Sequence, residues 1–369
     1  MPHDPYKALY LHMPFCKARC NYCDFHTAAT PEDSPQIDRY IEELVSQIRQ
    51  KSAEGELAEI ETVYIGGGTP TFTKSKSLSQ LLYALGLSMN LTTDVECTVE
   101  GNPESIDERL VRDIWALGAN RLSIGVQSFD DNLLQTLGRI HTSDDAKRAV
   151  LDAQTRFENV SIDLMCGLPE QTLEQFEHSL DEALDLGVKH ISVYPLTIEA
   201  GTKFDKMMRK GKLHIPDDDL QADMMELAAR KLESAGMGRY EVASYAFPGF
   251  ESKHNMSYWH GKPYLGLGES AVSMTQNSLR RMRTQDGMVV DDLDERQMAA
   301  EDLMLAMRMT SGIDDMRLES MRSLLPGLDD ELSRLEDLGL VHRVHDGWQP
   351  TEKGWLLGNE LFGALLDLG

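Results

Sequence analysis

The chain is short of basic residues and of cysteine, and it has no long apolar run. Lysine and arginine number 36 against 61 aspartate and glutamate, which gives a net charge of −25. Binding to nucleic-acid phosphates needs a basic surface, so nucleic acid is not an expected partner. No stretch approaches the roughly 18 consecutive apolar residues of a membrane-spanning helix. The first residues lack the basic and apolar segments of a secretory signal, so we expect a cytoplasmic protein.

Three of the five cysteines nevertheless stand close together. Cys16, Cys20 and Cys23 follow a short apolar segment at C-x3-C-x2-C spacing, which is an improbable accident in a chain this poor in cysteine. Three thiolates can bind three irons of a [4Fe-4S] cluster and leave the fourth iron open, whereas electron-transfer clusters use four cysteines. An open iron can bind a substrate or a cofactor. The other two cysteines, Cys97 and Cys166, lie in apolar strand patterns and are expected to be buried, inert thiols.

Short apolar, β-branched runs alternate with amphipathic stretches along the first two-thirds of the chain. This alternation predicts an α/β fold with a parallel sheet and right-handed crossovers. Six such units are typical of a TIM-type barrel or of a partial (β/α)6 barrel. The expected strands are 8–12, 62–65, 95–99, 121–126, 160–165 and 190–194, and the expected helices are 38–51, 77–87, 108–117, 142–157 and 172–186.

Polar groups and glycines follow these expected strands at the points where each strand ends. Taken singly, each of these residues has an ordinary structural explanation. A glycine can form a turn, and a carboxylate can be solvated or can cap a helix. Because the carboxyl ends of barrel strands converge on one face, their joint placement predicts a functional site there. The residues concerned are Gly67, Gly68, Thr69, Glu100, Gln127, Arg139 and Asp163.

Four segments resemble a known family. They are residues 10–16 (YLHMPFC), 66–71 (GGGTPT), 122–129 (LSIGVQSF) and 162–169 (IDLMCGLP). Together they resemble the radical S-adenosylmethionine (SAM) superfamily, and within it the HemN/HemW branch of anaerobic coproporphyrinogen-III oxidases and heme chaperones. The resemblance covers nearly the whole chain and implies a partial barrel in which SAM chelates the open iron of a [4Fe-4S] cluster.

The resemblance also implies roles for individual residues. Cys16, Cys20 and Cys23 would hold the cluster. The cluster-bound SAM would be contacted by Tyr10, Gly67 and Glu100. A second cofactor or substrate position would be surrounded by Gly68, Thr69, Gln127, Arg139 and Asp163.

Two places favour the chaperones over the oxidases within this branch. The oxidases carry a further cysteine in a C-x-C ending, whereas this chain continues Cys23-Asp24-Phe25, an ending typical of HemW. Residues 254–259 (HNMSYW) match the H-N-x-x-Y-W heme motif associated with HemW. An imidazole can ligate heme iron, and aromatic rings can lie against a macrocycle, so His254 is the predicted heme ligand. A histidine among aromatic residues is, however, more commonly a packed core residue.

One segment departs from the family pattern. Residues 266–273 are less glycine-rich than expected, and Glu269 stands in the middle of the run. An acid at this position would reshape the SAM or heme pocket.

The expected function is therefore that of a heme chaperone, which binds heme and transfers it to an acceptor apoprotein such as a respiratory cytochrome. An electron donor for the cluster, a homodimer, and peripheral contact with a membrane during delivery belong to the same expectation. The alternatives are an oxygen-independent coproporphyrinogen-III oxidase, a radical SAM methyltransferase that degrades heme, and an electron-transfer protein. The open-iron cysteine spacing counts against the last of these.

The C-terminal part has a different pattern. Residues 301–309 and 328–338 are expected to be helices, and two short strands around Asp346-Gly347 form a hairpin signal. This order predicts a winged-helix-like domain, yet residues 296–369 hold seven Lys and Arg against 14 Asp and Glu, which suits a cap over the barrel better than a DNA reader. The expected division is 1–245 for the barrel, 246–295 for the heme motif and a linker, and 296–369 for the cap. Arginines 280, 281 and 283 in the linker are expected on a solvated face, or against heme propionates.

Overall fold

A single curved sheet of 12 strands organises the molecule, in the order β14-β13-β12-β11-β1-β4-β5-β6-β7-β8-β10-β9. The computed structural model describes residues 3–89, 91–92 and 94–369. The six central strands are parallel neighbours, which confirms the expected βα order and the partial barrel. They are β1 (Ala8–Met13), β4 (Thr62–Gly67), β5 (Glu96–Gly101), β6 (Arg121–Gln127), β7 (Asn159–Cys166) and β8 (His190–Pro195).

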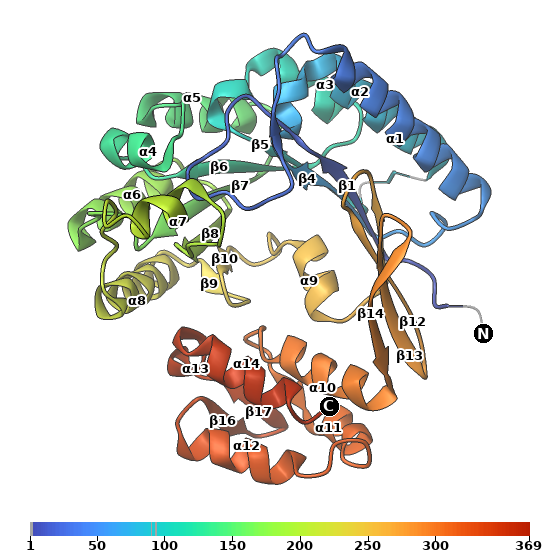
Figure 1. Ribbon diagram of the computed structural model, residues 1–369, viewed down its shortest axis with the longest axis vertical. Coiled ribbons are helices and arrows are strands. Elements are labelled where there is room, and N and C mark those ends of the chain that lie inside the picture. The colour runs from blue at the N-terminus through green and yellow to red at the C-terminus, as the bar shows by residue number, and fades with distance from the viewer. Residues whose placement is uncertain (1–2, 90, 93) are drawn as a thin grey trace.

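Helices cover the convex side of this arc, as Figure 1 shows. They are α1 (Pro35–Ala53), α2 (Lys74–Ser88), α3 (Glu108–Ala116), α4 (Asp131–Leu137), α5 (Ser143–Gln154), α6 (Leu173–Asp185), α7 (Lys203–Met208) and α8 (Asp218–Ser234). Two of them, α5 and α6, begin with a capping box, in which a threonine side chain and the third helical residue satisfy each other's backbone N–H groups.

Alternation along the strands separates the apolar core from a polar concave face. Val63 and Ile65 of β4 are fully buried in the main hydrophobic cluster, whereas Tyr64 between them is hydrogen-bonded to Glu100. Successive side chains of a strand point to opposite faces, so the residues that alternate with the core-facing apolar ones line the concave side. The sheet thereby places polar side chains inside the arc.

The segment expected to be a linker is structured and belongs to the main sheet. After β9 (Gly238–Arg239) and β10 (Ser244–Ala246), the chain forms α9 (Lys253–Trp259) on the concave side (Figure 1). It then adds β11 (Tyr264–Leu267), parallel to β1, and the antiparallel strands β12 (Val272–Asn277), β13 (Arg280–Gln285) and β14 (Met288–Asp294). The linker expectation differs from the structure because charged pairs across β13 and β14, rather than apolar alternation, hold these strands together.

The arginines of β13 pair with carboxylates of this chain. Arg281 is 1% exposed and donates to Glu301 and, at 2.7 Å, to Asp302. Arg283 donates to Glu301 at 2.7 Å. The expectation of a solvated face does not hold for Arg281, whose contacts tie β13 to the first helix of the C-terminal part.

The C-terminal residues form a small unit with a hydrophobic cluster of its own, built on Leu303, Leu332 and Leu361. Its three-stranded sheet has the order β15-β17-β16, and the hairpin lies where Asp346-Gly347 predicts it. The unit lies at the lower end of the molecule in Figure 1. Its elements are α10 (Glu295–Ala306), β15 (Ile313–Asp314), α11 (Asp315–Met321), α12 (Leu328–Asp337), β16 (Val341–Val344), β17 (Gly347–Pro350), α13 (Glu352–Leu356) and α14 (Gly358–Leu366).

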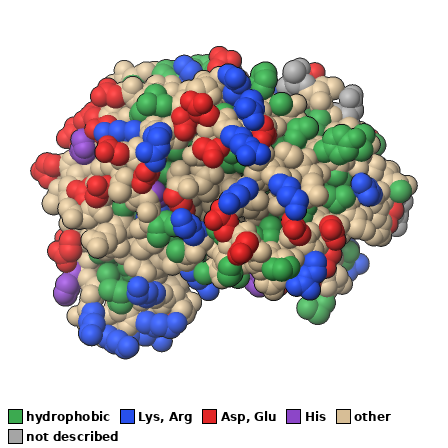
Figure 2. All heavy atoms as spheres, turned by 90° about the horizontal axis from the view of Figure 1, so that it is seen from above, with side chains coloured by type: hydrophobic (Ala, Val, Ile, Leu, Met, Phe, Trp, Pro, Cys, Tyr) green, Lys and Arg blue, Asp and Glu red, His purple; other side chains and the backbone are tan. Residues whose placement is uncertain are grey.

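On the face seen from above, acidic and basic side chains are interspersed over most of the surface, and basic side chains gather at its lower left edge (Figure 2). None of the helices in the described part of the chain is long and apolar enough to cross a membrane.

Candidate functional site

The three clustered cysteines lie on one loop after β1. Two short parallel strands, β2 (Phe15–Cys16) and β3 (Ala28–Ala29), pair with each other and close this loop at its base. All three thiols are partly buried and line one cavity of about 130 Å³ at the carboxyl ends of the barrel strands. Within the described residues, no three His, Cys, Asp or Glu side chains are arranged to hold a single metal ion. The cysteines therefore surround a space instead of converging on one point.

The remaining two cysteines lie elsewhere. Cys97 and Cys166 are buried in strands, as expected, and burial raises the pKa of each thiol to about 12. They are neutral thiols within the core, and the cysteine loop has no disulfide to either of them.

Polar groups from neighbouring strands contact the thiols of the loop. Thr69 donates its hydroxyl to the sulfur of Cys16 at 3.5 Å, and Arg139 donates Nη1 to the sulfur of Cys20 at 3.4 Å. Burial raises the pKa of the Cys16 thiol, and the Thr69 hydrogen bond opposes that rise. A guanidinium and a hydroxyl beside sulfur stabilise the thiolate form, which is the form that binds metal.

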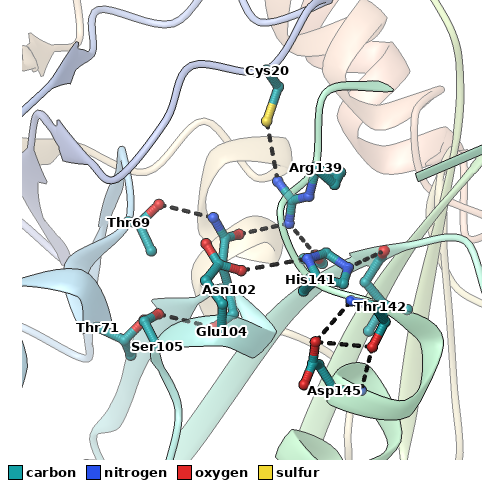
Figure 3. Close-up of polar contacts among 12 residues, drawn as sticks. Cys20, Thr69, Thr71, Asn102, Glu104, Ser105, Arg139, His141, Thr142 and Asp145 are labelled. Carbon is teal, nitrogen blue, oxygen red and sulfur yellow. Dashed lines mark hydrogen bonds and ion pairs between the residues drawn. The ribbon is translucent and has the colours of Figure 1, made fainter. Parts of the chain in front are cut away.

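Arg139 is the centre of the network drawn in Figure 3. Its Nη2 donates to Asn102 Oδ1 at 2.7 Å and also to the carbonyl oxygen of Gly125. Asn102 in turn donates Nδ2 to Thr69 Oγ1 at 3.0 Å. Asn102 is a site residue that our sequence analysis did not single out, although its place two residues after Glu100 puts it at the same strand end.

The glycine run at the end of β4 lets the backbone approach the cysteine segment closely. Gly67 has φ of 109°, and a Cβ atom there would lie 2.4 Å from the His12 ring. At Gly68 a Cβ would lie 2.7 Å from the carbonyl oxygens of Met13 and Phe15. Only glycine fits at these two positions without moving the strand that carries Cys16.

Two half-buried carboxyl groups, Glu100 and Asp163, line the cysteine cavity on the concave side of the sheet. Glu100 accepts from the Tyr64 hydroxyl at 2.5 Å and from the Gly67 N–H at 3.1 Å. Burial raises the pKa of Glu100, and burial together with the charge of Glu100 raises the pKa of Asp163 to about 7. A carboxyl group that titrates near neutral pH in a cavity is a common mark of a functional site.

Gln127 and Tyr10 take different places around the site. Gln127 closes β6 with φ of 69° at a register shift, a geometry that turns its side chain into the cysteine cavity. Tyr10 is hydrogen-bonded through its hydroxyl to His12 Nδ1 at 3.0 Å and lines a second cavity.

The second cavity adjoins the first and measures about 450 Å³. The two cavities share Phe25, Gly67 and Glu100 in their walls. The second cavity is largely aromatic, and its rings come from four separate segments of the chain: Tyr10, His12, Phe25, His26, Tyr258 and Tyr264. A larger groove of about 540 Å³ holds none of the predicted site residues.

His254 lies apart from the cysteine cavity. It is 1% exposed on α9, where Nδ1 is hydrogen-bonded to Thr62 Oγ1 at 2.9 Å and Nε2 to the Tyr258 hydroxyl at 3.1 Å. Its ring stacks on Tyr64 with centroids 5.0 Å apart, and burial lowers its pKa to about 3. Thr62 begins β4 and Gly67 ends it, so His254 sits at the opposite end of that strand from the cysteines. Its helix contributes Tyr258 to the second cavity.

Comparison with known proteins matches both parts of the chain. Residues 10–183 match the radical SAM superfamily model, and residues 293–357 match the HemN C-terminal domain. The chain is 35% identical to the protein named heme chaperone HemW of Bacillus subtilis, over 98% of this chain and 99% of that protein. It is 32% identical to the Escherichia coli protein of the same name, over 98% of each. The solved structure of Escherichia coli coproporphyrinogen III oxidase (HemN) superposes with a TM-score of 0.80, covering 98% of this chain and 90% of that one, at 22% identity.

Proposed function

The chain belongs to the HemW family of the radical SAM superfamily, and from this premise we propose that it is a heme chaperone, which binds heme and transfers it to an acceptor protein. The observation that carries the proposal is similarity along the whole chain to proteins named heme chaperones. The likeness to the oxidase structure supports the shared fold and not the oxidase reaction. The continuation Cys23-Asp24-Phe25 in place of a further cysteine also supports the chaperone.

The donor set of the cysteine cavity fits a [4Fe-4S] cluster, whose open iron would bind SAM. The thiols of Cys16, Cys20 and Cys23 would bind three irons, since soft thiolates on one loop are the usual ligands of such clusters. When bound, the cluster and SAM supply an electron and the radical chemistry of the sulfonium group. The protein would position the cluster and SAM and set the charge around them. Arg139 offsets negative charge at Cys20, and Glu100 presents a carboxyl group to hydrogen-bond donors of the cofactor.

The heme motif contributes to the neighbouring aromatic cavity. Tyr258 lines it, and the hydrogen bond between the Tyr258 hydroxyl and His254 Nε2 orients that hydroxyl. His254 as an iron ligand remains a prediction, and its ring would have to leave Thr62 or Tyr258 in order to bind iron. An aromatic cavity beside the cluster cavity suits a flat macrocycle.

Heme and an acceptor protein are the partners that this function requires, and the cluster requires an electron donor. We include in the proposal a respiratory apocytochrome as acceptor, a homodimer, and peripheral contact with a membrane during delivery. Transfer of heme to a membrane-embedded apocytochrome, followed by the change in Soret absorption, would test the acceptor and the membrane contact. Sedimentation of the free protein would test the homodimer.

The central experiment uses the cluster-loaded protein under anaerobic conditions. Hemin titration should give a saturable Soret band, and a heme-free cytochrome added afterwards should acquire the heme. Incubation with SAM, reductant and coproporphyrinogen should yield no protoporphyrinogen, and incubation with heme should leave the macrocycle intact. Absence of heme binding, or efficient porphyrinogen turnover, would overturn the proposal.

A further inference from the structure

We propose that residues 203–212, which follow β8 and include α7, are the docking surface for the electron donor of this chain, and that the donor is an acidic one-electron carrier protein (Figure 1). We call this segment the basic loop. The inference rests on the cluster of the proposed function and is independent of heme. It is carried by a concentration of positive charge and by the contact of the basic loop with the cysteine loop.

The basic loop is an exception in an acidic chain. Its ten residues hold five cations and one carboxylate, whereas the whole chain has a net charge of −25. The five cationic side chains are all exposed: Lys203, Lys206, Arg209, Lys210 and Lys212. The carboxylate, Asp205, is 7% exposed and pairs with Arg209 at 2.6 Å. Among the residues that the structure describes, Arg209 is the one cation of the loop with an ion pair, so the charge of the four lysines is open to a partner.

The basic loop contacts the cysteine loop between two of the cluster ligands. The Phe204 N–H donates to the carbonyl oxygen of Asn21 at 2.9 Å, and Asn21 follows Cys20 directly. The Phe204 ring is fully buried in a hydrophobic cluster against which Tyr22 packs. The buried face of α7 thus lies against the cysteine loop, and its lysines point to solvent. A carrier on the basic loop would lie beside the segment that holds the cluster, and electron transfer between proteins requires such proximity.

Charge complementarity makes an acidic carrier the partner that fits. Attraction between an ammonium-rich and a carboxylate-rich surface speeds encounter and fixes orientation. The rest of this acidic chain repels such a carrier, which disfavours docking elsewhere. Because charges are screened beyond about 8 Å at physiological salt, distant carboxylates do not cancel the local attraction. Met208, 41% exposed among the lysines, adds the apolar surface that interface centres contain.

The proposed step moves a single electron. The reduced carrier is oxidised, the oxidised cluster is reduced, and no bond forms or breaks. An anionic membrane would also be attracted to lysines, but it gains nothing from the contact with the cysteine loop, which favours the carrier.

The test uses the cluster-loaded, heme-free protein under anaerobic conditions, with a reduced plant-type [2Fe-2S] ferredoxin as the probe. Stopped-flow absorption measures the rate of cluster reduction, and calorimetry measures ferredoxin binding. The variant is the double substitution Lys206→Glu and Lys210→Glu. The control, Arg156→Glu and Lys353→Glu, changes the net charge equally. Arg156 precedes β7, at the end of the sheet opposite the cysteine loop, and Lys353 lies on α13 of the C-terminal unit.

We expect the Lys206/Lys210 variant to be reduced about tenfold more slowly than wild type at low salt, and to bind ferredoxin correspondingly more weakly. The difference should vanish at about 1 M salt, where screening acts within about 3 Å. The control should match wild type. Excess dithionite should reduce the cluster to the same end point in all three proteins, which reports an intact cluster.

Equal rates in the Lys206/Lys210 variant and wild type, an equal slowing in the control, or a wild type that ferredoxin does not reduce would overturn the inference. So would loss of binding to phosphatidylserine vesicles in the variant with unchanged reduction by ferredoxin, which would assign the basic loop to membranes. Hemin titration separates this inference from the chaperone proposal. A wild type that binds no hemin would overturn the chaperone proposal and leave the docking surface intact.

Discussion

Arg139 donates to the sulfur of Cys20 from a helix connection that is 119 residues away in sequence. The same guanidinium donates to Asn102 and to the carbonyl oxygen of Gly125 in β6, so one cation links the cysteine loop to two strand ends of the barrel.

Replacing Arg139 by alanine should lower the reduction potential of the reconstituted cluster by about 60 mV, which is a tenfold change for a one-electron couple. The reduced cluster carries more negative charge, and removal of a cation and a hydrogen bond at its ligand makes reduction less favourable. A spectroelectrochemical titration measures the potential. Arg322→Ala is the control, because Arg322 pairs with Asp329 in the C-terminal unit. A potential equal to that of wild type would contradict the role of Arg139.

Asp163 should make the protein less stable as pH rises. Its pKa is raised to about 7 in the folded protein, whereas that of an unfolded aspartate is about 3.9. Between these values the folded state binds more protons than the unfolded state, so the free energy of unfolding falls as pH rises from about 4 to about 7.

Thermal melting of the cluster-free protein across this range measures the effect. Asp163→Asn should flatten the decline, because the amide does not titrate. Asp181→Asn is a matched surface control, since Asp181 pairs with Lys231 and is half-exposed. Equal slopes in wild type and Asp163→Asn would contradict the assignment.

Gly67→Ala should destabilise the protein by about 1–3 kcal/mol and weaken SAM binding. The cost has two parts: a positive φ that side chains rarely adopt, and a collision with the His12 ring. Denaturant unfolding and equilibrium dialysis with SAM measure the two effects. Gly86→Ala on α2 is the control, because its Cβ would meet nothing within 4 Å and alanine favours a helix. Equal free energies of unfolding and equal SAM affinities in the two variants would contradict the role of close packing at Gly67.

Arg308→Ala should loosen α9 from the C-terminal unit. The Arg308 guanidinium lies between the Trp259 ring, 4.5 Å from its centroid, and the Phe362 ring at 4.9 Å. Loss of these cation–π contacts should cost about 1–2 kcal/mol and speed hydrogen exchange in α9. Exchange measured by mass spectrometry reports on the helix directly. Arg334→Ala, an exposed residue paired with Glu331 within α12, should leave α9 unchanged, and equal protection of α9 in both variants would argue against the contact.

The parallel core and the position of the cysteine loop were predictable because short sequence patterns indicate them. Strands β4 to β8 carry buried apolar residues at alternate positions, and the polar residues that end them meet because parallel strands bring their carboxyl ends together. Gln127 was placed correctly at a strand end, but its positive φ arises from a register shift against β7 that the sequence does not signal.

Other features depend on partners that are distant in sequence. The β12–β14 strands resemble a linker because charged residues such as Arg283 and Asp291 occupy them, and only the pairing of those residues across β13 and β14 reveals the sheet. His254 matches a heme motif, but it is buried and hydrogen-bonded to Thr62, 192 residues earlier, which the motif does not signal. The hydrogen bond between His26 and Glu269 is likewise visible only once β1 and β11 lie side by side.

The shared wall of the two cavities has a thermodynamic consequence. Glu100 borders both spaces, so a charged occupant of either one alters the field and the protonation of the same carboxyl group. Occupancy of one cavity must then change affinity in the other, and by the same factor in both directions. The affinity of this protein for a ligand in one cavity would therefore depend on whether the other cavity is occupied.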